Sequence, residues 1–191
     1  IYKIFFLYLG LLPFVFLTGG PLHSVYYWVG RKENRDSYLI SAFQLTCILS
    51  LLIVLIGLPL SYVMTNSLGL SLDLVVLLIF SAALWVPSSF YKEYMIAMGA
   101  TVWGSIFGTL IEMIKVVLFI GLAFYDFSLV TIFFSFLIYV ALKFILTIFL
   151  LKREKFHFTI FDLSKIKEVF WYSAPIASAG LLTFLVEKMD Q

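Results

Sequence analysis

The sequence predicts an all-α, polytopic membrane protein. Of its 191 residues, 63% are hydrophobic and only 13% are charged, and the mean hydropathy is +1.08. A soluble domain of this length needs more polar surface than this composition supplies. The apolar residues form five long stretches and the start of a sixth, and the basic residues are concentrated in every second connection. Membrane-spanning helices joined by short loops explain both observations.

Five stretches have the length of a membrane span. An α-helix needs roughly 20 residues to cross about 30 Å of hydrocarbon. No run shows the alternating ten-residue pattern of a barrel strand, so each span is expected to be helical. The expected spans cover residues 5–29, 38–64, 72–91, 101–124 and 128–151 and form an N-terminal bundle, 1–151.

The distribution of basic residues predicts the orientation. The first, third and fifth connections carry Arg31, Lys32 and Arg35, then Lys92, then Lys152, Arg153, Lys155, Lys165 and Lys167. The second and fourth carry only Asp73 and Asp126. By the positive-inside rule, loops 30–37, 92–100 and 152–169 are expected to be cytoplasmic in a multi-pass protein of a bacterial inner membrane.

The C-terminal part is expected to begin a second bundle. Residues 152–169 mix basic and aromatic side chains and predict a cytoplasmic connecting loop whose second half lies along the membrane interface as an amphipathic helix. Residues 170–191 then re-enter the membrane. The chain starts and stops within apolar helices, so we expect a fragment of a longer protein, truncated at both ends.

The first span contains helix-breaking residues near its middle. Gly19, Gly20 and Pro21 follow Pro13 in this span. Proline lacks a backbone donor and clashes with the carbonyl four residues earlier, so a kink or break is expected around residues 17–21. Broken helices are common in transporters, although proline is also frequent in membrane helices of other kinds.

One face of the expected helix 101–124 carries small residues that are followed by charged residues. Gly104 and Gly108 form a GxxxG pattern that predicts close helix packing. Glu112 and Lys115 follow on the same face near the middle of the span, where an ionised side chain is costly unless it has a partner or water. Two interpretations stay open for this pair: an internal salt bridge, or two side chains that line an aqueous cavity.

Two further polar clusters lie in the spans. Lys143 belongs to a stripe that repeats every four residues, and it either lines a lumen or extends toward the headgroups. Lys188 and Asp190 lie with Glu187 at the end of the chain. Three charged clusters within spans favour a polar lumen. The stripe consists of Thr131, Ser135, Tyr139, Lys143 and Thr147.

Other classes of site have no sequence signature. The chain lacks a Walker loop, GxSxG, HExxH and any metal-ligand spacing of Cys and His, so no enzyme, metal or cofactor is expected. The single cysteine, Cys47, lies in an apolar stretch and predicts no intrachain disulfide. No basic patch with interleaved aromatic residues indicates nucleic-acid binding.

The chain resembles the polysaccharide flippases, which export O-antigen and capsule repeat units and are related to multidrug and toxic-compound extruders. The resemblance spans nearly the whole chain and is carried by the basic and acidic loop GRKENRDS at 30–37, by KEVFWYSAPI at 167–176 and by GLLTF at 180–184. It implies helices two to six of the first bundle of a two-bundle transporter and the start of helix seven.

The resemblance also implies a function and a substrate. Such proteins flip an undecaprenyl-pyrophosphate-linked oligosaccharide across the membrane by alternating access, with cationic lumen groups near the pyrophosphate. Lys115 and Lys188 would take that role here, with Glu112 and Asp190 as partners or coupling-ion sites. The chain departs from family members that use intramembrane arginines, because none lies in its spans. A multidrug extruder of the same fold, or an integral membrane polymerase or acyltransferase, are the alternatives.

Overall fold

The computed structural model describes residues 2–30, 34–125, 128–154, 156 and 161–189, a few of them by their backbone only. Within these residues the secondary structure is helical, without strands. The helices are α1 Tyr2–Val15, α2 Gly19–Gly30, α3 Arg35–Leu68, α4 Leu72–Trp85, the 3₁₀ turn η1 Pro87–Ser89, α5 Phe90–Ala97, α6 Thr101–Tyr125, α7 Leu129–Arg153 and α8 Leu163–Met189.

Four helical stretches are long and apolar enough to cross a membrane, which is compatible with the expected class. Within the part of the chain that the structure describes, they are Arg35–Ser67, Leu72–Ala97, Thr101–Leu122 and Leu129–Arg153. They correspond to the expected spans 38–64, 72–91, 101–124 and 128–151. The second stretch contains α4, η1 and α5, and it extends six residues beyond the expected end.

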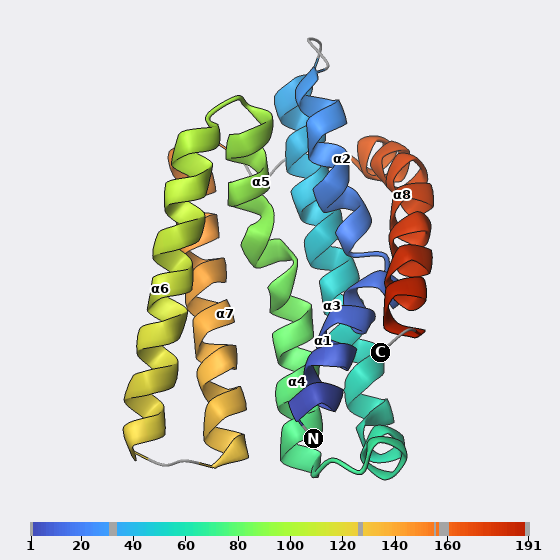
Figure 1. Ribbon diagram of the computed structural model, residues 1–191. Coiled ribbons are helices and arrows are strands. Elements are labelled where there is room, and N and C mark those ends of the chain that lie inside the picture. The colour runs from blue at the N-terminus through green and yellow to red at the C-terminus, as the bar shows by residue number, and fades with distance from the viewer. Residues whose placement is uncertain (1, 31–33, 126–127, 155, 157–160, 190–191) are drawn as a thin grey trace.

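α1 and α2 run in one direction and α3 runs back, α4 and α5 again run together in the first direction, and α6, α7 and α8 then alternate (Figure 1). The α6–α7 pair forms one edge of the bundle, α8 forms the opposite edge, and the other helices lie between them. The α5–α6 connection lies at the same end as the C-terminus of α7 and the N-termini of α3 and α8. The α3–α4 turn and the adjacent ends of α6 and α7 lie at the other end. The expected cytoplasmic connections therefore share one end of the bundle.

Short turns at both ends use residues that tolerate unusual backbone angles. Gly69 ends α3 with φ of 63°, and Gly99 follows α5 with φ of 81°. Glycine adopts these left-handed conformations without a Cβ clash. At the start of α7, the Ser128 Oγ accepts a hydrogen bond from the Thr131 N–H and caps the helix.

The first expected span is divided into two helices. α1 ends at Val15 and α2 begins at Gly19, with Leu17 between them at φ of 57°. The backbone N–H and Oγ of Thr18 donate hydrogen bonds to the Pro13 carbonyl, at 2.9 Å and 3.0 Å, and close this turn. The break thus immediately precedes Gly19, Gly20 and Pro21, which form the buried first turn of α2.

Apolar side chains pack into two clusters along the bundle. One contains Trp28, Phe43 and Phe90 and lies in the half with the α5–α6 connection. The other contains Phe5, Leu78 and Phe133 and lies in the other half. Trp85 and Phe107 pack against both clusters. The candidate site lies beside these two residues, between the ends of the bundle.

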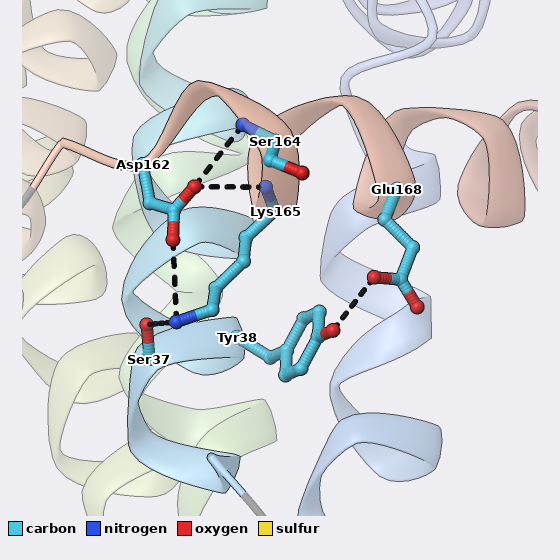
Figure 2. A network of polar contacts seen from close by, with 6 residues as sticks. All are labelled: Ser37, Tyr38, Asp162, Ser164, Lys165 and Glu168. Carbon is cyan, nitrogen blue, oxygen red and sulfur yellow. Dashed lines mark hydrogen bonds and ion pairs between the residues drawn. The ribbon is translucent and has the colours of Figure 1, made fainter.

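α8 contacts α3 through a polar network (Figure 2). The Lys165 Nζ donates to the Ser37 Oγ at 2.7 Å and lies 3.3 Å from the Asp162 Oδ2. The Tyr38 hydroxyl donates to Glu168 at 2.6 Å. Residues 163–169 are the first turns of α8 itself. The expected placement of this part of 152–169 along the membrane interface stays a prediction. The apolar residues of this segment, Ile166 and Val169, are buried in the cluster that contains Trp28. 

Candidate functional site

A break between α4 and α5 places polar groups inside the bundle. Pro87 starts the 3₁₀ turn η1, because its ring cannot accommodate a regular helical turn before it. The Ser88 carbonyl accepts a hydrogen bond from the Thr147 Oγ1 at 2.7 Å, and the Ser89 Oγ accepts one from the Lys143 Nζ at 2.9 Å. The break is thereby fixed to α7. The sequence contained its signal, Pro87 followed by two serines, but the expected break was placed only in the first span.

The polar stripe of α7 faces the bundle interior. Ser135, Tyr139, Lys143 and Thr147 are buried, and Thr131 is half-buried. A repeat of four residues drifts slowly around a helix of 3.6 residues per turn, so these side chains stay on one broad face. That face is directed toward η1 and α6 rather than outward.

Lys143 is the charged residue of this stripe, and it is buried. It is 8% exposed, and its Nζ lies 5.3 Å from the centre of the Trp85 ring in a cation–π arrangement. It also lies about 15 Å along the helix from Arg153, at 1.5 Å per residue. Lys143 is therefore directed into the bundle, toward Ser89 and Trp85.

Glu112 and Lys115 on α6 are joined to the stripe through Tyr139. The Lys115 Nζ and the Glu112 Oε2 form an ion pair within one helical turn. The Tyr139 hydroxyl donates to the other carboxylate oxygen, Oε1, at 2.7 Å, and the Lys115 Nζ lies 5.6 Å from the Tyr139 ring centre. The internal salt bridge is thus present. The same carboxylate also lines a cavity, so the two interpretations do not exclude each other.

The cavity has a volume of about 230 Å³ and lies between η1, α5, α6 and α7. Charged side chains of both signs line it, two lysines and two glutamates. A site of this kind can bind a polar group that carries anionic and hydrogen-bonding atoms. Its lining consists of Trp85, Ser89, Lys92, Glu93, Phe107, Gly108, Ile111, Glu112 and Lys143.

Lys92 and Glu93 were not expected in this site. Lys92 was expected in the cytoplasmic loop 92–100, but Lys92 and Glu93 both belong to α5, which continues to Ala97. The loop prediction is wrong for 92–97, because the short apolar run MIA continues the helix beyond the two charges. Glu93 also accepts a hydrogen bond from the Tyr26 hydroxyl on α2 at 2.8 Å. A charged pair that begins three residues after Ser89 was the available signal.

The GxxxG glycines of α6 pack against α5, the helix that carries Lys92. A Cβ on Gly104 would lie 2.9 Å from the Ile96 Cγ1 and 3.3 Å from the Lys92 carbonyl oxygen. A Cβ on Gly108 would lie 3.5 Å from the Lys92 side chain. The missing side chains let α6 approach α5 closely, and this approach forms one wall of the cavity.

The remaining candidates lie elsewhere. Gly20 faces α8, since a Cβ on it would lie 2.6 Å from the Ser173 carbonyl oxygen. Gly19 and Pro21 are buried beside it in the first turn of α2, and none of the three lines the cavity. Asp190 lies outside the described residues, and so do the side chains of Glu187 and Lys188. Across the described residues, no cluster of three His, Cys, Asp or Glu side chains is placed to hold a metal ion.

Comparisons with protein-family models, with curated proteins and with solved structures find no match for this chain. The site therefore has to be interpreted from its own geometry.

Proposed function

We propose that the chain is part of a membrane transporter that flips a lipid-linked oligosaccharide across a bacterial inner membrane by alternating access. The observation that carries this proposal is the charged cavity between the two apolar clusters, next to the break at η1. Charged side chains inside a membrane are costly, and they occur mainly on substrate or ion pathways. Broken helices with exposed backbone groups are a further feature of such pathways.

The chemistry of the cavity suits the headgroup of an undecaprenyl-pyrophosphate-linked glycan. Lys92 and Lys143 would pair with the anionic pyrophosphate, and Ser89 would donate a hydrogen bond to it. Glu93 and Glu112 would accept hydrogen bonds from sugar hydroxyls or bind a coupling ion. Lys115 remains tied to Glu112, so Lys143 replaces it as the leading candidate for the contact with the pyrophosphate.

Export of a cationic drug is the second candidate function. Glu93 and Glu112 supply two carboxylates to the cavity, and Trp85 supplies an aromatic face. Carboxylates and aromatic rings are the groups that recognise an organic cation. Flipping of the glycan would depend on the lysines of the cavity, and export of a cationic drug would depend on its glutamates. Substitution of one or the other can therefore separate the two functions.

Complementation of a deletion strain tests the proposal. Cells without the full-length gene should lose surface glycan and accumulate lipid-linked repeat units inside, and the wild-type gene should reverse both effects. Lys143→Met should fail to restore export, whereas Lys152→Met, at the exposed end of the same helix, should restore it. Both variants are compared at equal membrane abundance. Normal surface glycan in the deletion strain, with increased sensitivity to cationic drugs, would instead establish drug export.

A further inference from the structure

An open apolar groove runs along the outside of α5, α6 and α7. Its volume is about 420 Å³, within the range of roughly 300–1,000 Å³ typical of ligand sites. It is separate from the charged cavity, although Phe107 lines both. Trp103, at the start of α6, is 67% exposed beside it. The apolar part of the lining consists of Met95, Trp103, Ile106, Phe107, Leu110 and Leu150.

The groove extends inward from the end of the bundle that carries the basic connections. Trp103 lies near that end, and Leu110 lies about 10 Å deeper along α6, at 1.5 Å per residue. Tryptophan is typical of the headgroup level of a membrane. The groove thus leads from headgroup level into the hydrocarbon, as one acyl chain of a lipid in that leaflet does.

Two opposite charges stand at the outer end of the groove. Arg153 ends α7 and Glu154 follows it, both exposed and both in the groove lining. The buried ring of Tyr91 completes this end. A guanidinium binds a phosphate, and a carboxylate binds a primary ammonium. Arg153 and Glu154 together therefore complement a zwitterionic headgroup that carries a phosphate and a primary ammonium.

We propose that this groove binds phosphatidylethanolamine, with its phosphate on Arg153, its ammonium on Glu154 and an acyl chain along Ile106 and Leu110. Phosphatidylglycerol, which is anionic, has no ammonium to pair with the Glu154 carboxylate. Phosphatidylcholine has an ammonium without N–H donors and forms no hydrogen bond to Glu154. The inference rests on the membrane location of the proposed function but not on the transported substrate.

Native mass spectrometry of the full-length protein in detergent tests the proposal. The protein is mixed with equal amounts of phosphatidylethanolamine, phosphatidylcholine and phosphatidylglycerol that carry identical acyl chains. One phosphatidylethanolamine should be retained preferentially. Arg153→Gln should reduce its retention about tenfold, as expected for the loss of one charge-assisted hydrogen bond, whereas Lys152→Gln, one residue away, should leave it unchanged.

A second pair of variants tests the acyl-chain part of the groove. Leu110→Trp should fill the groove and displace the lipid, whereas Val117→Trp, on an exposed part of α6, should not. If Leu110→Trp does not fold, the comparison of Arg153→Gln with Lys152→Gln decides alone. Equal retention of the three lipids, or equal effects of Arg153→Gln and Lys152→Gln, would overturn the proposal. This experiment measures lipid retention and not surface glycan. Its outcome can therefore be told apart from a failure of the transport proposal, which the complementation of the deletion strain tests.

Discussion

The Lys143 Nζ donates a hydrogen bond to the Ser89 Oγ, 2.9 Å away, and so links the middle of α7 to the break between α4 and α5. This contact, together with the Trp85 ring, compensates for part of the cost of burying an ammonium group. The adjacent contact from Thr147 to the Ser88 carbonyl fixes the same break. The position of the buried lysine and the conformation of the break thus depend on each other.

Removal of the Ser89 hydroxyl should destabilise the protein. Ser89→Ala leaves the buried Lys143 ammonium without this acceptor, and we expect a loss of about 1–3 kcal/mol in the free energy of unfolding. Ser88→Ala is the comparison, because it keeps the contact from Thr147 to the Ser88 backbone carbonyl and removes only the hydrogen bond that the Ser88 hydroxyl donates to the Trp85 carbonyl, so its loss should be smaller. Thermal unfolding in detergent measures both. Equal losses for the two variants would contradict the assigned role of Ser89.

Tyr139 and Glu112 should be energetically coupled. Tyr139→Phe removes the hydroxyl that donates to the Glu112 carboxylate, and Glu112→Gln removes the charge that it meets. Because Glu112 is half exposed, we expect a modest coupling energy of about 1 kcal/mol in a double-mutant cycle. Additive effects of the two substitutions would show that the contact between α6 and α7 contributes nothing to stability.

Gly20 should be intolerant of a side chain, unlike its neighbour Gly19. A Cβ on Gly20 would lie 2.6 Å from the Ser173 carbonyl oxygen and 3.0 Å from the Ala177 Cβ on α8, so Gly20→Ala should cost about 1–3 kcal/mol. A Cβ on Gly19 meets nothing within 4 Å. Gly19→Ala should therefore be neutral or slightly stabilising. If thermal unfolding shows that Gly20→Ala is equally harmless, α2 and α8 do not pack as described.

The start of α8 should be less stable in acid. Two backbone N–H groups, of Lys165 and Ser164, and the Lys165 ammonium hold the pKa of Asp162 below its usual 3.8. A lowered pKa in the folded state means that the stabilisation is complete above the ordinary pKa and is lost as the pH falls through the lowered one. Asp162→Asn should therefore lower the Tm at pH 6 but not once Asp162 is protonated. Ser164→Ala, whose side chain takes no part, should show no such dependence on pH.

The sequence predicted the helices better than it predicted their contacts. Length and hydropathy alone located the spans that contain α3, α6 and α7, and the four-residue repeat identified the stripe with Lys143. Periodicity cannot show which helix faces that stripe, so the contacts to Ser89 and Glu112 required the fold. Lys92 and Glu93 were assigned to a loop because charges near the end of an apolar run usually mark the membrane surface. In the structure the helix continues past them, since they face a cavity.

Cysteine accessibility in native membranes tests the central claim, that the charged cavity is a hydrated pathway within the membrane. In a Cys47→Ser background, Ser89→Cys and Val117→Cys are treated with a charged, membrane-impermeant thiosulfonate from each side in turn. The account predicts modification of Ser89→Cys, because water reaches the cavity and ionises its thiol, and none of Val117→Cys, which is 69% exposed on the outer face of α6. Modification of Val117→Cys with protection of Ser89→Cys would contradict it.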